Sequence, residues 1–287
     1  MLKKLLGISP QQEPDGSLRP SKLALKLATS DTTDFEPISY TKYQGQKSKI
    51  LVIFTEQKNM KMKNGKEFST GNHPVEALVP MLHMRDAGFE FEIVTPTGKP
   101  VVFEMWAMPQ KDEAVLDIYN QLKPQFENPN SLQNFVDPTS GSLDDVTSYA
   151  AVFVPGGHGA MLGIPEDPNV GRVLNWAHQN KLFTISLCHG PGAFLSTTLF
   201  GEKFLYEGYK MAVFPDSVDK KTPLIGYLPG PMPRGLSEPL KELGANVVNT
   251  KADDTCCLDR NLITGASPQA ANELGKLAAT TLLKALT

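Results

Sequence analysis

Residues 48–55 read Ser-Lys-Ile-Leu-Val-Ile-Phe-Thr, a short apolar run that is rich in β-branched side chains. A run of this kind is typical of a strand buried on both faces of a parallel sheet. The segment Pro74–Gly88 follows, with apolar side chains on one side and a terminal glycine, and it predicts a helix that ends near Gly88. Residues 89–96, Phe-Glu-Phe-Glu-Ile-Val-Thr-Pro, predict the next strand. A strand, a helix and a strand in this order predict parallel pairing with a right-handed crossover.

The same alternation continues toward the C-terminus. The sequence predicts further strands at 149–155, 182–188 and 261–265, and helices at 169–180, from 191 to 198 and at 269–286. This order favours an α/β fold in which helices sandwich a doubly wound, mostly parallel sheet.

Three segments fall outside this alternation. Residues 1–47 are polar and without clear period, so we interpret them as an N-terminal arm or lid, with disorder as the alternative, on a domain that spans 48–287. Two long insertions, about 97–146 and 215–240, interrupt the domain. Ordered loops of this length are usually functional.

Composition excludes several classes of protein. The 287 residues include 28 basic and 31 acidic side chains, for a formal net charge of −3, which indicates neither nucleic-acid binding nor an anionic membrane. We find no apolar stretch of signal-peptide or membrane-spanning length. The three cysteines, at 188, 256 and 257, are too few for a disulfide framework. We therefore expect a cytoplasmic protein that does not bind membranes, and we assign no role to Cys256 and Cys257.

The sharpest chemical signal is the segment 185–192, Ile-Ser-Leu-Cys-His-Gly-Pro-Gly. A predicted strand runs directly into Cys188, and small residues open the next helix. This is the geometry of a nucleophile elbow, which presents a reactive side chain in a strained turn at the carboxyl edge of the sheet. The helix N-terminus favours a thiolate, and neighbouring His189 can relay a proton. The alternative is a cysteine that only packs, but the Gly-Pro-Gly setting favours function.

Two other segments are candidates for the same crevice. Residues 154–159, Val-Pro-Gly-Gly-His-Gly, follow a predicted buried strand, so the amides of Gly156 and Gly157 are candidates for an oxyanion hole. A plain glycine turn is an equally good interpretation. Because the carboxyl ends of parallel strands converge, we expect this turn to lie near Cys188. Glu76 lies in the first turn of a predicted helix, where a glutamate commonly matches the helix dipole, and its functional role depends on the fold.

Together these segments resemble the ThiJ/PfpI superfamily, and more narrowly its heat-shock branch. The matching segments are His-Pro-Val-Glu at 73–76, Phe-Glu-Met-Trp-Ala-Met-Pro at 103–109, Val-Pro-Gly-Gly-His-Gly at 154–159, Ser-Leu-Cys-His-Gly-Pro at 186–191, Ala-Val-Phe-Pro-Asp-Ser-Val-Asp at 212–219 and Leu-Ile-Thr-Gly-Ala-Ser-Pro at 262–268. The resemblance implies a flavodoxin-like sheet of the class I glutamine amidotransferase type, with insertions that form a small cap. It also implies the activities described for this branch: glyoxalase III (D-lactate dehydratase), protein and nucleic-acid deglycase, and holdase chaperone.

The resemblance implies a role for individual residues. Cys188 takes the position of the nucleophile, His189 that of the triad histidine, and Glu76 that of the carboxylate that contacts the thiol. Asp219 matches the acidic member of the triad, and Asp216 in the same loop is the near alternative. A buried Glu76 would keep its proton and hydrogen-bond the thiolate, while Asp219 would orient His189.

The chain departs from the branch at one place. Bacterial members can bind zinc through a His–Glu–His set on a peripheral part of the fold, where this sequence has Arg85, Glu90 and Leu122. Only one carboxylate is left, whereas a zinc site normally has three protein ligands. His83 lies close by but out of step, and His158 has no ligand-like spacing. We therefore expect neither a metal nor another cofactor.

These observations lead to one functional hypothesis and two alternatives. We expect an enzyme that converts 2-oxoaldehydes such as methylglyoxal to D-lactate through a hemithioacetal on Cys188, with Glu76 or His189 moving a proton between C1 and C2. Glycated proteins and nucleotides are the expected further substrates. One alternative is a cysteine peptidase or amidase that uses Cys188, His189 and Asp219. The other is a chaperone that binds unfolding clients through exposed apolar surface. The resemblance also implies a homodimer.

Overall fold

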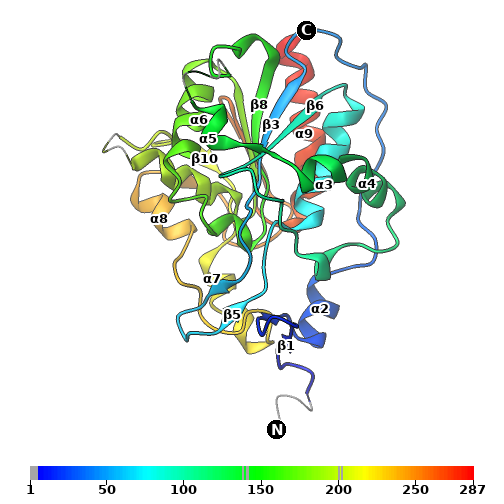
Figure 1. The fold of residues 1–287 in the computed structure, drawn as a ribbon, viewed down its shortest axis with the longest axis vertical. Coiled ribbons are helices and arrows are strands. Elements are labelled where there is room, and N and C mark those ends of the chain that lie inside the picture. Colours follow the sequence, from blue (N-terminus) through cyan, green and yellow to red (C-terminus); the bar gives the residue numbers. More distant parts are fainter. Residues whose placement is uncertain (1–5, 138, 140–141, 200, 202) are drawn as a thin grey trace.

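A parallel sheet forms the centre of the molecule (Figure 1). The computed structural model describes residues 6–137, 139, 142–199, 201 and 203–287. The parallel strands are β3 (Lys49–Ile53), β6 (Glu90–Thr95), β7 (Asn130–Ser131), β8 (Tyr149–Val154), β9 (Phe183–Leu187) and β13 (Leu262–Gly265). An antiparallel edge strand, β12 (Cys256–Asp259), completes the spatial order β12-β13-β9-β8-β3-β6-β7. The predicted doubly wound, mostly parallel α/β fold is thereby confirmed.

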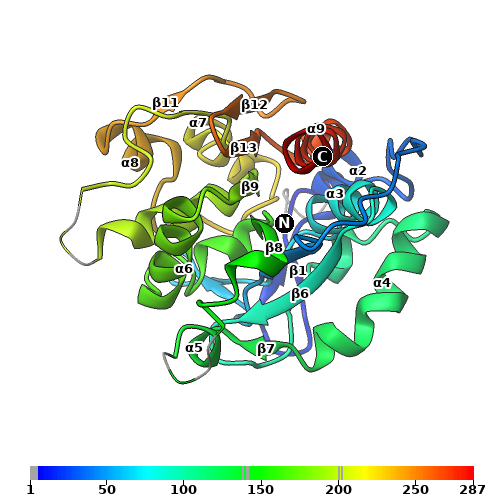
Figure 2. The ribbon, with the colours of Figure 1, turned by 90° about the horizontal axis from the view of Figure 1, so that it is seen from above.

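Helices cover both faces of this sheet (Figure 2). One face carries α3 (Pro74–Asp86), α4 (Glu113–Glu127) and α9 (Ala271–Leu286), and the other carries α5 (Leu132–Phe135), α6 (Pro168–Gln179) and the 3₁₀ helix η5 (Gly190–Thr198). Side chains of a strand point alternately to the two faces. In β3, Ile50 and Val52 therefore pack into the core under α3, whereas Leu51 and Ile53 pack into the core on the other face.

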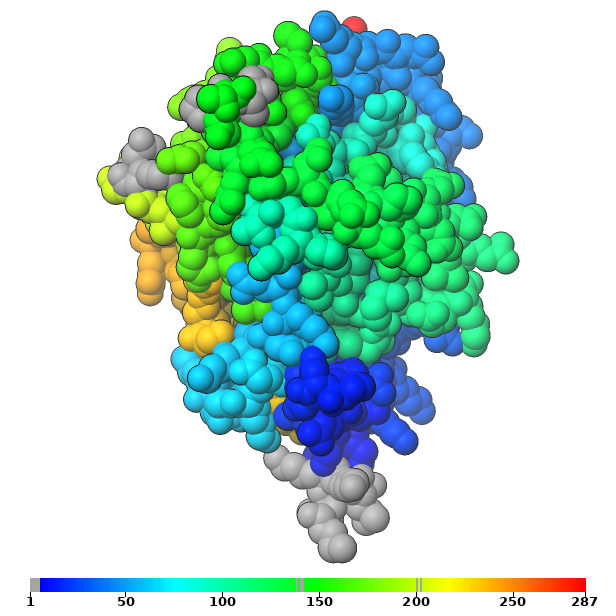
Figure 3. All heavy atoms as spheres, in the orientation of Figure 1, coloured from blue at the N-terminus to red at the C-terminus, as the bar shows by residue number. Residues whose placement is uncertain are grey.

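Residues from distant parts of the chain gather at the end of the sheet where the parallel strands end. A small sheet with the order β1-β2-β5-β4 joins the N-terminal segment to residues 60–68. Its strands are β1 (Gln11–Gln12), β2 (Leu18–Arg19), β4 (Met60–Lys61) and β5 (Glu67–Phe68). Helix α2 (Lys22–Ala28) follows β2, and Figures 1 and 3 show this N-terminal segment against β5 at the lower end of the molecule.

The two insertions contain the long helix α4 and several short elements, none of which their sequence predicted. The first holds η1 (Met105–Ala107), α4, β7 and α5, and the second holds α7 (Asp216–Asp219), η6 (Thr222–Leu224) and α8 (Ser237–Glu242). The remaining short elements are η3 (Val146–Ser148), η4 (His158–Met161), η7 (Pro268–Ala270) and the parallel pair β10 (Lys210–Met211) and β11 (Asn246–Val247). In the part of the chain that the structure describes, no helix combines the length and apolar character needed to span a membrane.

Candidate active site

Cys188 occupies a strained turn at the end of β9. Its φ of +59° lies in the left-handed region, which residues with a side chain seldom adopt and which concentrates at functional sites. Two backbone hydrogen bonds of 2.9 Å hold the turn: the Cys188 N–H donates to the Gly265 carbonyl, and the Cys188 carbonyl accepts from the Phe214 N–H. A Cβ on Gly190 would strike the Val154 carbonyl and the Ser186 hydroxyl, so the chain after the cysteine needs glycine. This is the shape of a nucleophile elbow.

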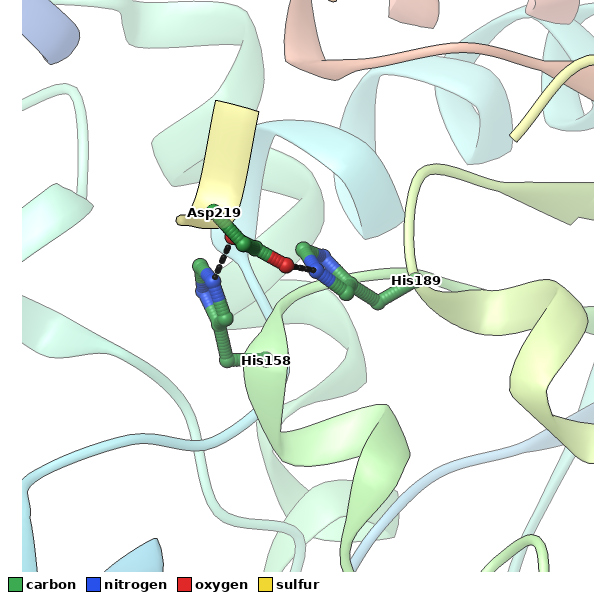
Figure 4. A group of neighbouring side chains, drawn as sticks. All are labelled: His158, His189 and Asp219. Atoms are coloured by element: carbon green, nitrogen blue, oxygen red, sulfur yellow. Dashed lines mark hydrogen bonds and ion pairs between the residues drawn. The ribbon is translucent and has the colours of Figure 1, made fainter. Parts of the chain in front are cut away.

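A chain of hydrogen-bonding groups leads away from the thiol, and Figure 4 shows the part of it formed by His189, Asp219 and His158. The Cys188 Sγ lies 3.3 Å from Nδ1 of His189, and Nε2 of His189 lies 2.8 Å from Oδ2 of Asp219. The other carboxylate oxygen of Asp219 lies 2.9 Å from Nε2 of His158. An ionised carboxylate can only accept, so both Nε2 atoms carry hydrogen. Nδ1 of a neutral His189 is therefore free to accept the thiol proton.

The two histidines keep Asp219 ionised. Burial by itself would raise the pKa of this carboxyl, but the charges of His189 and His158 and their hydrogen bonds outweigh it and hold the pKa well below its usual range.

Asp216, the alternative predicted from the sequence, has a different structural role. Its carboxylate accepts hydrogen bonds from the backbone amides of residues 236, 237 and 238, at 2.7–3.1 Å, and so positions the start of α8. The structure thus places Asp219, and not Asp216, against His189.

Glu76 reaches the thiol from the first turn of α3. It is buried and lies against the Cys188 side chain and the Gly157 amide. Burial, followed by the charge of Glu104, raises the pKa of Glu76 well above its usual range. Burial and then the charge of Glu76 also raise the pKa of Cys188. Two acids this close disfavour being charged together, so at least one of the two keeps its proton. When Glu76 keeps that proton, it can donate it to the thiolate.

The two glycines after β8 have different places. Gly157 has a φ of +99°, and its amide lies beside Cys188 and Glu76. Gly156 packs behind them, where a Cβ would strike the Glu76 carboxyl and the Leu187 carbonyl. Gly157 lines the cavity above the thiol, so of the two amides it is the better placed for an oxyanion.

The cavity above Cys188 has a volume of about 300 Å³. Its polar lining consists of two acids, three imidazoles, a phenol and a few neutral groups, and the described lining residues include neither lysine nor arginine. Leu27 and Ala28, at the end of α2, line both this cavity and a neighbouring one of about 370 Å³. The N-terminal segment therefore forms part of the wall of the site.

Four lining residues with ionisable side chains had no role predicted from the sequence: His73, Glu104, His158 and Tyr227. Burial and then the charge of His158 lower the pKa of His73 to about 3, so this imidazole is neutral. Burial raises the pKa of Glu104 to about 7. Glu104 lies in the segment 103–109, which was identified only by its resemblance to the family. The spacing of Glu104 from the other site residues predicts no chemical role.

One group of described residues has ligand atoms near enough to hold a metal ion. These atoms belong to His158, His189 and Asp219 and lie within 4.8 Å of one another. Hydrogen bonds between them already pair each atom. The peripheral positions Arg85, Glu90 and Leu122 do come together and line a cavity of about 300 Å³, where Glu90 is the one carboxylate of the three. The expected absence of a metal stays a prediction.

A doubly wound sheet with a cysteine elbow, a following histidine and a facing glutamate defines a protein of the DJ-1/PfpI class. The model of the DJ-1/PfpI family matches residues 68–281, so the chain belongs to this family, and the resemblance to the ThiJ/PfpI superfamily is confirmed. It is 47% identical over 271 residues, 94% of either chain, to protein/nucleic acid deglycase HchA of Escherichia coli O157:H7. It is 46% identical, with the same coverage, to protein/nucleic acid deglycase 1 of Escherichia coli K12.

Solved structures show the same fold. The structure titled APC35852 matches with a TM-score of 0.68 and 24% identity, over 83% of this chain and 99% of that one. Glyoxalase III of Candida albicans matches with a TM-score of 0.62 and 21% identity, over 82% of this chain and 98% of that one.

Proposed function

We propose that this chain is a glutathione-independent glyoxalase that converts methylglyoxal to D-lactate and that also acts on glycated proteins and nucleotides. The observation that carries the proposal is the position of the Cys188 thiol, between the carboxyl of Glu76 and the imidazole of His189 at the base of a cavity. The deglycase relatives, at 46–47% identity over 94% of the chain, support it.

The first step joins the thiol to the aldehyde. The Cys188 sulfur attacks C1, an S–C1 bond forms, and the carbonyl π electrons move to O1. The Gly157 amide stabilises this oxyanion. In the reactive form Cys188 is ionised and Glu76 is protonated, and the proton of Glu76 passes to O1. A neutral hemithioacetal results, and Glu76 is left as a carboxylate beside C1.

The second step is the isomerisation. Glu76 takes the proton from C1, the electrons form a C1=C2 double bond, and the C2 carbonyl electrons move to O2. Return of the proton to C2, together with loss of the proton on O1 and gain of a proton by O2, yields a thioester of lactate. Water, activated by His189 with Asp219 behind it, then hydrolyses the thioester and restores the thiol. Early adducts of methylglyoxal with amines exchange with the free aldehyde, so the same steps remove them.

Lactate formation tests the proposal directly. We expect the unaltered protein to form lactate from methylglyoxal without glutathione, and Cys188→Ala to lose about 10³-fold or more of that rate. Cys257→Ser is the matched control, because this half-buried cysteine lies on β12 away from the cavity lining. Full lactate production by Cys188→Ala would sink the mechanism.

A cysteine amidase is the second candidate, and the ionised Asp219 behind His189 favours it. That arrangement is the one used to activate a nucleophile for acyl transfer. Turnover of aminoacyl amides faster than that of methylglyoxal would establish it. Client binding and the homodimer stay predictions, tested by suppression of client aggregation and by sedimentation.

A further inference from the structure

Glu104 lines the cavity but has no part in the steps above. It is 1% exposed, and its position is fixed by the backbone: its N–H donates to the Asn72 carbonyl at 3.0 Å, immediately before α3 begins. The Thr70 hydroxyl donates to Oε1 of Glu104 at 2.6 Å. The other oxygen, Oε2, has no partner among the described residues. A buried polar atom without a partner is costly and marks a place where a ligand atom can bind.

The surroundings of Glu104 contain no lysine or arginine among the described lining residues. The groups that face it are Glu76 of α3, His158 of η4 and Tyr227 of the second insertion, together with the backbone amides of residues 71 and 158. Two acids and a phenol therefore share one small volume. Glu104 and Glu76 line the same cavity of about 300 Å³, so a small substrate bound against Glu76 shares this cavity with the Glu104 carboxyl.

The isomerisation moves two protons, and Glu76 accounts for only one of them. The carbon-bound proton passes from C1 to C2. The oxygen-bound proton must also leave O1, as the thioester carbonyl forms, and O2 must gain one to become the hydroxyl of lactate. A single carboxyl beside the sulfur cannot hold both protons at once. A second acid near O2 would complete the transfer.

We propose that Glu104 is this second acid, and that its unpartnered carboxyl oxygen serves O2 and O1 of the bound substrate. The inference rests on the proposed function. As the C1–H bond breaks and electrons move to O2, Glu104 gives its proton to O2. As the C2–H bond forms and the C1 carbonyl closes, Glu104 takes the proton from O1. Atoms balance, and Glu104 ends each cycle protonated.

The electrostatics of the position suit this task. Burial raises the pKa of Glu104 to about 7, against partial opposition from His158, Thr70 and the nearby amides. A group with a pKa near the working pH can give and take a proton with equal ease. Glu104 then donates below about pH 7 and is ionised above it.

Glu104→Gln is the direct test, since the amide oxygen can still accept from Thr70 and the fold is kept. We expect kcat for lactate formation to fall about 10²–10⁴-fold. The hemithioacetal on Cys188 should still form, as seen by mass spectrometry after rapid quenching. Methylglyoxal with deuterium at C1 should show a larger isotope effect than with the unaltered protein. Glu90→Gln, a carboxylate outside the cavity, is the control.

A second variant keeps the carboxyl and changes its pKa. The unaltered protein should lose activity as the pH rises through about 7, because Glu104 then lacks its proton. Thr70→Val removes a hydrogen bond that favours the ionised form, so this loss should move to higher pH.

Several outcomes would overturn the assignment. The first is a Glu104→Gln variant with unchanged kcat, and the second is one in which only KM changes. The third is a Thr70→Val variant that loses activity over the same pH range as the unaltered protein. If Cys188-dependent lactate formation persists in such a case, the proposed function stands and only the role of Glu104 fails. If the unaltered protein forms no lactate, both fail together.

Discussion

The two sides of the cavity differ in how their polar atoms are paired. On one side, both oxygens of Asp219 meet an imidazole Nε2, at 2.8 and 2.9 Å. On the other side, Oε2 of Glu76, Oε2 of Glu104 and Nδ1 of His73 have no hydrogen-bond partner among the described residues. Both sides are buried to a similar degree, with 1–7% of these side chains exposed.

The difference separates residues that fix the geometry of the site from residues that are available to react with a substrate. A fully paired network fixes geometry, and it loses stability when one member is removed. Unpartnered buried atoms contribute no such stability and are available to a substrate. Substitutions on the paired side should therefore reduce both stability and activity, and those on the open side should reduce activity alone.

Glu76→Gln, on the unpartnered side, should reduce activity more than either substitution on the paired side. The amide cannot take the C1 proton, so we expect kcat/KM to fall about 10³-fold. The melting temperature should stay the same or rise, because a carboxyl that resists ionisation is replaced by a neutral group. Calorimetry and a lactate assay on the same preparation check this. A large decrease in melting temperature with unchanged activity would show that Glu76 stabilises the site and does not act on the substrate.

Asp219→Asn should come next and should reduce both properties. We expect about a 10²-fold loss of kcat/KM, the lower end of what a positioned acid or base contributes, because His189 loses the group that orients it. One of the two charge-assisted hydrogen bonds becomes unfavourable and the other weakens, which should lower the free energy of unfolding by about 2–3 kcal/mol. Asp216→Asn is the matched control: it should destabilise through α8 and change kcat/KM much less. A reversed order of kcat/KM would assign Asp216 to the triad.

His158→Gln tests whether the second histidine only supports Asp219. His189 keeps its own hydrogen bond in this variant, so we expect a loss of about 10-fold in kcat/KM. A loss as large as that of Asp219→Asn would show that His158 acts on the substrate itself.

The smallest effect should be on the pH dependence of stability. The folded pKa of Glu104, about 7, lies above the ordinary value of 4.5. Between these limits the unfolded chain releases the proton and the folded chain keeps it, so stability falls as the pH rises and the full penalty is reached above 7. Glu104→Gln lacks this penalty. Its melting temperature should exceed that of the unaltered protein by an amount that grows from pH 5 to pH 8. An offset independent of pH would contradict the raised pKa.

Much of the fold could be predicted because its signals are local. The helix predicted to end near Gly88 ends at Asp86, and the strand predicted at 149–155 is β8 at Tyr149–Val154. The two-residue strands β10 and β11 could not be predicted, since they depend on pairing between distant segments and have no period of their own. The helix predicted from 191 to 198 lies within η5, which winds as a 3₁₀ helix over Gly190–Thr198.

The candidate site divides in the same way. Cys188 and His189 stand next to each other after a strand, so their sequence alone indicates chemistry. His158 meets Asp219 across 61 residues, and Glu104 meets Thr70 across 34, and no spacing rule predicts either contact. These contacts form only in the folded chain, where the loops at the carboxyl edge of the sheet lie next to one another.

The left-handed backbone at Cys188 has an evolutionary consequence. Glycine adopts this conformation freely, whereas a residue with a Cβ loses about 1–2 kcal/mol there. A lineage that no longer needed the thiol would therefore relieve this backbone strain by drifting to glycine at this one position. Selection for catalysis is what opposes that drift, and a relative with glycine at the elbow would be a descendant that has given up its chemistry while keeping its fold.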